Sequence, residues 1–493
     1  MPTLAEINSV APDTPVFILH LYDRAILNGA ALRAAGITKD SPDPFGGRIE
    51  RDKNGNPTGM LIAEPNALIL YSTLSKGPKL PIEDQINSTR HFMRELNRLG
   101  VTSCIDAGGG FQNYPDDYEV INKLHKSGQM TLRIAYNLFT QKPGGELADF
   151  QKWTAMVKPY SGDGFYRHNG AGEMLAFSAA DFEDFLQPRP DMPANMEKDL
   201  GAVVRYLVEQ RWPFRLHATY DETIGRALDV FEAVDKDTSF SDLRWFFDHA
   251  ETVSDRNLER IKKLGGGIAI QHRMAYQGEC FVDRYGAKAA RNTPPITTML
   301  KMGVPVGGGT DATRVASYNP FVSLYWLTTG KTVGGMSLYD DKNVLNREEA
   351  LRLWTVGGAY KSNEEKLKGT LADGMYADLA VLSGDYMTVA DEDIKDLTSV
   401  LTVVGGKIVY AADEFSDYDA ELPPASPDWA PVRQFGGYQA AHASYGEAAN
   451  SCTIHGHRHG SDGILSRWLG LEECSSRLKF ENPWALGCGC FAY

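Results

Sequence analysis

Short apolar runs alternate with amphipathic stretches along most of the chain, and the apolar runs end in polar residues. The stretch EDQINSTRHFMRELNRLG has helical spacing, ends in a glycine and leads to an apolar run at residues 101–106. This order of helix, glycine, strand and polar loop is typical of a βα repeat. The unit recurs, which predicts strands at residues 101–106, 131–136, 163–169, 213–217, 243–249, 268–272 and 303–311.

Seven strands that each follow a helix predict an α/β fold with a parallel sheet, and their spacing suits a (β/α)8 TIM barrel over residues 81–365. A closed barrel of this kind has eight strands. The repeats therefore leave the first barrel strand unaccounted for, and we expect it to be missing from this chain.

The flanking regions have different patterns. Residues 1–80 are rich in turn signals and contain one clear strand at residues 16–20. Residues 366–412 hold short apolar runs at 377–382, 400–404 and 407–410, and the Gly405-Gly406 pair between the last two is typical of a hairpin. We expect a small β module there, followed at residues 413–493 by an extended tail of weak periodicity.

Three of the predicted strands end in residues that can bind a metal ion. The run GVPVGGG stops at Asp311, and His217 and His249 follow apolar runs at corresponding positions. Side chains at the C-terminal ends of barrel strands meet the substrate. Imidazoles and a carboxylate are the ligands of a catalytic zinc ion, and a carboxylate can take a proton from the attacking water. The alternative for Asp311 is a helix N-cap, and for the histidines a structural role.

Weaker candidates lie at other strand ends. His272 and Arg273 follow the strand at 268–272 and could hold a substrate carbonyl or carboxylate, although a surface or supporting role fits them equally well. His168 is a candidate contact for substrate or metal. Asp106, followed by three glycines, could line the pocket or cap a helix.

Composition limits the classes of function. The chain has 493 residues, enough for two to three domains, and its 43% hydrophobic content allows a large core. A net charge of −14 disfavours nucleic acids and anionic membranes as partners. No apolar run reaches the roughly 20 residues of a membrane span, and the N-terminus has no signal-peptide pattern, so we expect a cytoplasmic protein.

The cysteines are unevenly placed, since four of the six fall after residue 450. The tail contains Cys452, His455, His457 and His459, and later Cys488-Gly489-Cys490. Thiolates and imidazoles at this density can bind zinc or copper, but the spacing matches no standard structural zinc motif. The segment could equally be a flexible one that binds metal ions adventitiously.

Several segments resemble the metal-dependent amidohydrolase superfamily. LHATYDETIGRALDVFE, FFDHAETVSDRNLERIKKLG and MGVPVGGGTDATRVASYNP are similar to its strands five, six and eight. In this superfamily the chain returns to a β-sandwich after the last barrel strand. Three later segments resemble that part: LNREEALRLWTVGGAY, KGTLADGMYADLAVLSGD and LTVVGGKIVY. Within the superfamily, residues 1–412 resemble amidohydrolase family 3, which includes the N-substituted formamide deformylases. Residues 1–80 then correspond to an inserted subdomain between barrel strands one and two, and residues 366–412 to part of the β-sandwich.

The resemblance implies roles for the strand-end residues. His217 and His249 would bind the metal from strands five and six, and Asp311 would bind metal and act as the general base. Asp221 matches an acidic position whose role is undefined. The family's HxH pair at the end of strand one has no counterpart before residue 455. Many family members carry a carboxylated lysine at the end of strand four, and that lysine bridges two metal ions. Here the corresponding segment reads FYRHN, with Glu173 shortly after it. We therefore expect one zinc ion rather than a bridged pair.

The sequence therefore predicts a metal-dependent hydrolase of a non-peptide carbon–nitrogen bond, with a small-molecule amide or formamide as substrate. Two alternatives remain: an amidohydrolase-like barrel without activity, and a metal-binding protein that acts through its Cys/His tail. Whether the chain forms a homo-oligomer stays open.

Overall fold

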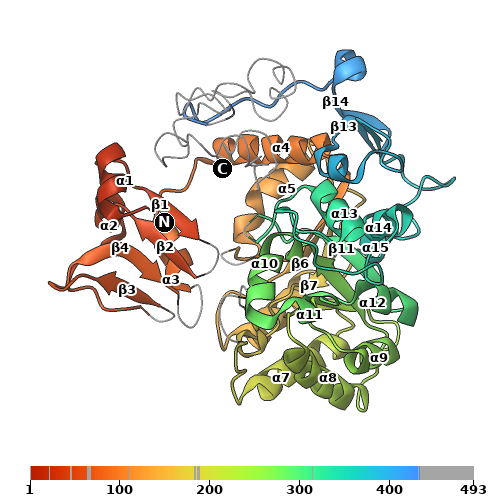
Figure 1. The fold of residues 1–493 in the computed structure, drawn as a ribbon, viewed down its shortest axis with the longest axis horizontal. Coiled ribbons are helices and arrows are strands. Elements are labelled where there is room, and N and C mark those ends of the chain that lie inside the picture. Colours follow the sequence, from red (N-terminus) through yellow and green to blue (C-terminus); the bar gives the residue numbers. More distant parts are fainter. Residues whose placement is uncertain are drawn as a thin grey trace. The chain divides into compact units, whose positions relative to one another are not determined.

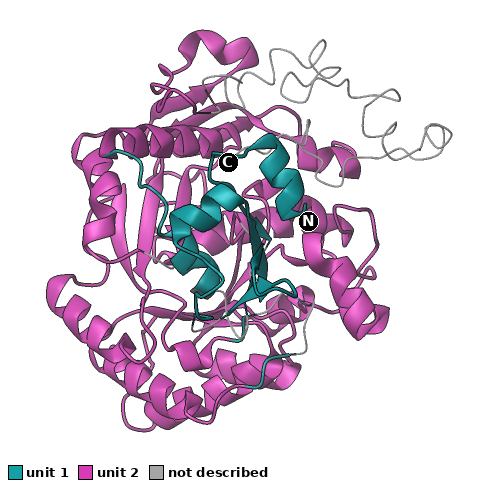
Figure 2. Cartoon of the chain, turned by 90° about the vertical axis from the view of Figure 1, so that its left-hand side faces the viewer, with its two compact units in different colours: residues 1–81, 181–191 teal, residues 82–180, 192–493 magenta. Residues whose placement is uncertain are grey.

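The computed structural model describes residues 2–430, apart from residues 21–22, 45–46, 64–67, 110–111, 183–184, 186–188 and 314, together with residue 432. The chain divides into two compact units (Figure 2). The first consists of residues 1–81 and 181–191, and the second of residues 82–180 and the chain from residue 192 onward. The Cys/His tail predicted to bind metal lies outside the described residues.

The first unit contains a four-stranded antiparallel sheet in the order β1-β2-β4-β3. The segment from 2 to 81 forms α1 (Leu4–Val10), β1 (Phe17–His20), β2 (Arg24–Leu27), α2 (Gly29–Ala35), β3 (Arg48–Arg51), β4 (Pro57–Ile62) and α3 (Leu68–Leu74). Leu27, Leu61 and Leu70 are buried in its own small core. The strand predicted at residues 16–20 is present as the edge strand β1, but the turn-rich pattern concealed the other three strands of the sheet.

The second unit is built on a seven-stranded parallel sheet with helices outside it (Figure 1). Its spatial order, β11-β10-β9-β8-β7-β6-β5, is the reverse of the chain order, as in a barrel that winds in one direction. The strands are β5 (Ser103–Asp106), β6 (Arg133–Leu138), β7 (Tyr166–Ala171), β8 (Phe214–Ala218), β9 (Trp245–His249), β10 (Gly267–Gln271) and β11 (Val306–Gly309). All seven predicted strands are confirmed, and the fold is an α/β barrel of the TIM type.

Helices and short helical turns alternate with these strands. They are α4 (Ile82–Arg98), η1 (Asp116–Tyr118), α5 (Glu119–Lys126), α6 (Glu146–Met156), η2 (Phe177–Ala179), α7 (Met196–Glu209), α8 (Asp221–Asp235), α9 (Asp255–Lys263), α10 (Met274–Tyr285), α11 (Ala287–Ala290), α12 (Ile296–Met302), α13 (Pro320–Thr329), α14 (Arg347–Trp354) and α15 (Val356–Lys361). α12 ends at Gly303, which has φ of 73°, a left-handed conformation that glycine adopts without steric cost. The glycine signals in the sequence thus mark real helix ends.

Strands β8, β9 and β10 are buried at every residue, because helices cover their outer face and the barrel interior their inner face. On the outer face, Phe231 of α8 packs edge-on against Trp245 and stacks on Phe247, with ring centroids 5.1 and 5.6 Å apart. This apolar layer fixes the strands whose ends carry the two candidate histidines.

The C-terminal module is a three-stranded antiparallel sheet of β12 (Leu379–Leu382), β13 (Ser399–Val404) and β14 (Lys407–Ala411), flanked by η3 (Asp391–Asp396) and η4 (Asp413–Tyr418). Arg133 of β6 reaches this module. Its Nε donates to Asp378 Oδ2 at 2.6 Å and its Nη2 to Asp378 Oδ1 at 2.9 Å, and both side chains are buried. Asp378 also accepts from the backbone N–H of Gly405. The ion pair therefore joins the barrel to the module.

In the described part of the chain, no helix combines the length and the apolar character that a membrane crossing requires.

Replacing Asp378 with alanine is expected to lower the free energy of unfolding by about 3 kcal/mol, because it leaves the Arg133 guanidinium buried without its carboxylate. Urea denaturation followed by circular dichroism measures this. The exposed Arg352–Glu348 pair provides the control, and Arg352→Ala should cost about 0.5 kcal/mol or less. An equal decrease in the free energy of unfolding in the two variants would contradict a structural role for the buried pair.

Candidate metal centre

Three neighbouring strands deliver polar side chains to one end of the parallel sheet. His217 is the fourth residue of β8, His249 is the last residue of β9, and Glu173 follows β7 by two residues. The strands pair in register, with Ala218 opposite His249. The backbone N–H of His217 donates to the carbonyl of Glu173 at 3.1 Å, which fixes the loop after β7 against β8.

The side chains of Glu173, His217 and His249 converge on one point. Each offers a donor atom, and the three atoms lie within 4.8 Å of one another. His249 Nε2 is 3.1 Å and His217 Nδ1 is 3.5 Å from Glu173 Oε2, and the imidazole centroids are 4.4 Å apart. Two imidazoles and a carboxylate at these separations match the ligand set of zinc.

The cluster is electrostatically coupled. Burial alone would raise the pKa of Glu173, but hydrogen bonds and attraction from His217 and His249 outweigh it and hold that pKa well below its usual value. For His249, burial and the neighbouring His217 act to lower the pKa, whereas the hydrogen bond to Glu173 raises it above the ordinary value. The three groups therefore stabilise a carboxylate facing protonated imidazole when no metal ion competes with the proton.

Asp311 follows β11 by two residues and borders the cluster without joining it. Its side chain is exposed at the strand end, and it is not one of the three groups whose donor atoms converge. Although the residue is open to solvent, the protein atoms that surround its carboxyl group raise its pKa to about 6, and Glu173 adds to that rise. His249, Arg273 and His217 oppose it. The balance leaves a carboxylate that is ionised at neutral pH and basic enough to accept a proton.

A buried ion pair lies one layer below the imidazoles. Arg215 precedes His217 by two residues, so both side chains lie on the same face of β8. Its Nε donates to Asp248 Oδ2 at 2.8 Å, and the side chains are only 7% and 5% exposed. Burial acts to lower the pKa of Arg215, but Asp248, Glu173 and Asp311 together raise it. Arg215 thus supplies a fixed positive charge beneath the two site carboxylates.

His272 and Arg273 are both buried. Burial lowers the pKa of His272 to about 4, against the opposing effect of the carbonyls of Gly309 and Ser317. Arg273 donates through Nε to Gln277 Oε1 at 2.9 Å, and its charge acts on Asp311. The structure therefore brings Arg273 close enough to influence the site, while His272 lies between backbone carbonyls.

His168 does not reach the cluster. It packs against Trp212, with ring centroids 4.6 Å apart, and its Nδ1 lies 3.2 Å from the carbonyl of Lys158. Burial lowers its pKa to about 4. In these surroundings His168 is a neutral, packed side chain.

Two other acidic candidates have local structural contacts. Asp106 accepts a hydrogen bond from the backbone N–H of Gly108 at 2.9 Å. Asp221 accepts from the backbone N–H of Ser254 and from Asn257 Nδ2, both at 2.7 Å, so it ties the start of α8 to the start of α9.

Glu173 is the candidate ligand that the sequence analysis did not name. Its position was noted after the fourth barrel strand, but only as a departure from the lysine of the family. The available signal was its place as the first carboxylate after β7, at the same end of the sheet as His217 and His249. A search that included the two residues after each predicted strand would have found Glu173.

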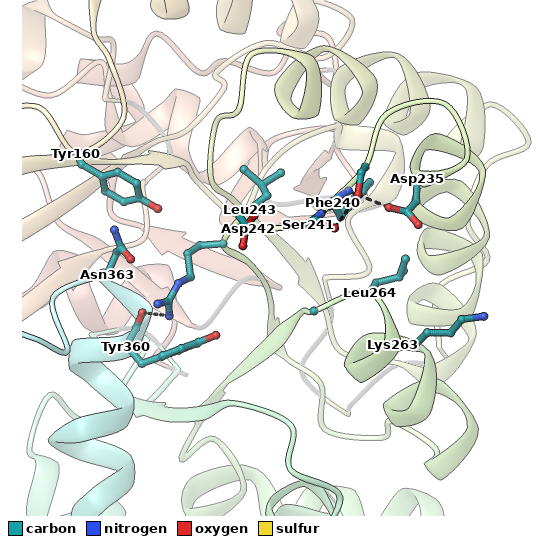
Figure 3. Close-up of a pocket in the computed structure, with 13 residues that line it drawn as sticks. Tyr160, Asp235, Phe240, Ser241, Asp242, Leu243, Lys263, Leu264, Tyr360 and Asn363 are labelled. Carbon is teal, nitrogen blue, oxygen red and sulfur yellow. Dashed lines mark hydrogen bonds between the residues drawn. The ribbon is translucent and has the colours of Figure 1, made fainter.

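A separate cavity of about 590 Å³ lies at the opposite ends of the strands (Figure 3). Its walls include Asp242 and Arg244 immediately before β9, Gly265 before β10, and Tyr160 and Tyr360. Arg244 donates to the carbonyl of Tyr360 and lies over that ring, with 3.6 Å between the guanidinium carbon and the ring centroid. This end of a barrel generally serves stability rather than catalysis.

Replacing His168 with phenylalanine is expected to reduce acid destabilisation between pH 6.5 and 4. The folded protein holds the imidazole neutral because its pKa is lowered to about 4, whereas the unfolded chain binds a proton below about 6.5. As the pH falls from 6.5 to 4, the free energy of unfolding of the wild type should therefore decrease more than that of the variant. Thermal midpoints measured from pH 4 to 8 test this. Parallel curves for the two proteins would refute a neutral buried His168.

The chain is similar in sequence to known proteins from other organisms. The chain is 26% identical to YtcJ of Bacillus subtilis over 426 residues, covering 83% of this chain and 76% of that protein. It is 24% identical to the N-substituted formamide deformylase of Arthrobacter pascens, again over 83% of this chain and 76% of the relative.

A crystal structure titled as an uncharacterized metal-dependent hydrolase from Pyrococcus horikoshii has the same fold, with a TM-score of 0.58 and 20% identity, over 80% of this chain and 76% of that one. The amidohydrolase family matches residues 1–410. Because that match spans most of the sequence, this chain belongs to the amidohydrolase family.

Proposed function

We propose that the chain is a metal-dependent hydrolase that cleaves a non-peptide carbon–nitrogen bond in a small amide or formamide. The observation that carries the proposal is the convergence of Glu173, His217 and His249 beside a carboxylate of raised pKa at the C-terminal end of the barrel sheet. Metal binding and proton transfer would thus be available within one site.

The donor set fits zinc better than calcium or magnesium, which prefer oxygen ligands. His217 and His249 would hold the ion through imidazole nitrogen, and Glu173 through Oε2, which already lies within 3.5 Å of both rings. When bound, zinc would supply Lewis acidity that polarises a substrate carbonyl and makes an attacking water more acidic.

Asp311 would take the proton from the attacking water. A pKa raised to about 6 leaves the group mostly ionised at pH 7 yet more basic than an ordinary aspartate. Having received the proton, Asp311 could return it to the departing nitrogen. Arg273 would limit the rise in the pKa of Asp311, since its charge favours the ionised form.

The substrate class rests on similarity rather than on the pocket. One curated relative is an N-substituted formamide deformylase, which supports an amide or formamide. The proposal therefore names the bond that is cleaved and the amide or formamide class, and no individual substrate.

Glu173→Gln and His217→Ala are each expected to reduce zinc content from about one equivalent to well below half, because either change removes a ligand. Elemental analysis of the purified full chain measures this. His125→Ala is the matched control: His125 lies on α5 and pairs with Asp163 away from the cluster, so its zinc content should equal that of the wild type. Unchanged zinc in both site variants would refute the assigned ligands.

Asp311→Asn should lower kcat for an N-formyl amine at least about 100-fold, because amide nitrogen and oxygen cannot act as the base. Zinc content measured on the same sample separates two roles. Retained zinc assigns Asp311 to proton transfer alone, and lost zinc adds it to the metal ligands. Full activity in this variant would exclude Asp311 as the base.

These measurements also separate the alternatives. A folded protein that holds zinc but hydrolyses none of a panel of amides would favour a barrel without activity. Zinc that disappears when residues 433–493 are deleted, and not when Glu173 is changed, would favour a metal-binding tail. No observation on the described residues favours either alternative over hydrolysis.

A further inference from the structure

The strand that carries Asp311 has one side without a neighbouring strand in the described sheet. β11 pairs with β10 on one side only. The N–H of Ile268 donates to the carbonyl of Pro305 at 2.9 Å. Successive carbonyls of a strand point in opposite directions, so the carbonyls of Pro305 and Gly307 face β10, and those of Val306 and Gly308 face away. The outward carbonyls need other partners.

Helix α15, which Figure 1 labels near β11, packs against that open side of the strand. A Cβ atom built on Gly357 would lie 2.6 Å from the carbonyl oxygen of Val306, and one on Gly307 would lie 2.7 Å from the carbonyl oxygen of Gly357. Real Cβ atoms do not approach so closely, so glycine is required on both the helix and the strand. The pair lets α15 lie directly against the backbone of β11.

Lys361, the last residue of α15, satisfies the second outward carbonyl. Its Nζ donates to Gly308 O at 3.0 Å, and the residue is 6% exposed. The backbone carbonyl of Lys361 accepts from Asn169 Nδ2 of β7 at 3.3 Å, which holds the helix end from the other side of the barrel. The lysine thus makes, with a side-chain amine, a hydrogen bond that a neighbouring strand would otherwise make.

The charged groups around Lys361 belong to the layer below the metal centre. Arg215 of β8 and Asp248 of β9 act on its amine with opposite signs. Burial, reinforced by Arg215, lowers the pKa of Lys361 to about 7, and Asp248 opposes the change. Both the neutral and the charged amine retain N–H groups, so the bond to Gly308 survives either state.

We propose that Lys361 is a positioning residue that completes the open side of β11 and thereby holds Asp311 in place beside the metal ligands. Gly308 lies three residues before Asp311, and the intervening Gly309 and Thr310 leave little else to fix the direction of the chain. The inference rests on the proposed function for its catalytic meaning, but the anchoring of β11 is independent of it.

Lys361→Met tests the proposal in the full-length protein. We expect kcat for an N-formyl amine to fall about 10- to 100-fold while zinc content stays at the wild-type level, because Asp311 is the proposed base and lies outside the three converging donor groups. Lys368→Met is the matched control: Lys368 is similarly buried but pairs with Glu364 at 2.6 Å. Its kcat should stay within about threefold of the wild type. Equal kcat values in the two variants would overturn the positioning role.

A pair of glycine variants tests the same contact without removing the lysine. Gly357→Ala pushes α15 away from Val306, whereas Gly358→Ala places its methyl group in open space on the same helix. Only the first should lower kcat. Should Lys361→Met fail to fold, this pair still decides: identical kcat values in the two alanine variants would reject the inference.

Hydrogen exchange separates failure of this inference from failure of the proposed function. In zinc-free protein, amides of residues 303–313 should exchange faster in Lys361→Met and Gly357→Ala than in their controls, because the edge of β11 loses its support. If wild-type protein binds no zinc, the proposed function fails, and faster exchange alone still upholds the anchor. Unchanged exchange in both variants would overturn it.

Discussion

The contact between the Glu173 carboxylate and two imidazoles is the interaction on which the rest of the site depends. A carboxylate buried at this depth is costly unless positive charge or hydrogen-bond donors surround it. His217 and His249 supply both, and they hold the pKa of Glu173 far below its ordinary value. Because each residue follows a different strand, the contact also fixes three strand ends relative to one another.

A second charged layer inside the barrel supports the first. Arg215 and Asp248 form a buried pair directly below the histidines, and Arg215 acts on both Glu173 and Asp311. Its positive charge partly offsets the repulsion between the two carboxylates. Lys361 enters the same layer from α15 and connects it to the strand of Asp311. Charged and polar side chains therefore occupy the inner face of the sheet, next to the candidate metal ligands. The apolar packing of Phe231, Trp245 and Phe247 lies on the outer face.

Much of the fold follows from local pattern. The apolar runs at 213–217, 243–249 and 268–272 become the fully buried strands β8, β9 and β10, because a parallel sheet covered on both faces tolerates few polar residues. Helix-ending glycines such as Gly303 mark where the chain turns into the next strand. The same repeat predicts that side chains after these strands share one end of the sheet, which is why His217, His249 and Asp311 were identified as candidates.

The sequence by itself determined the order of the βα units and the strand ends at which polar groups occur. Only the tertiary structure decided which of those groups meet. Glu173 lies in the loop after β7, and backbone hydrogen bonds to residues of other βα units set its position, so its place in the sequence could suggest it as a candidate but could not show that it meets the two histidines. His168 is the third residue of β7, which continues to Ala171, so it lies within the strand and not at its end, and its side chain packs on Trp212. Pairing between segments distant in the sequence sets where each strand ends, and local pattern does not supply that pairing.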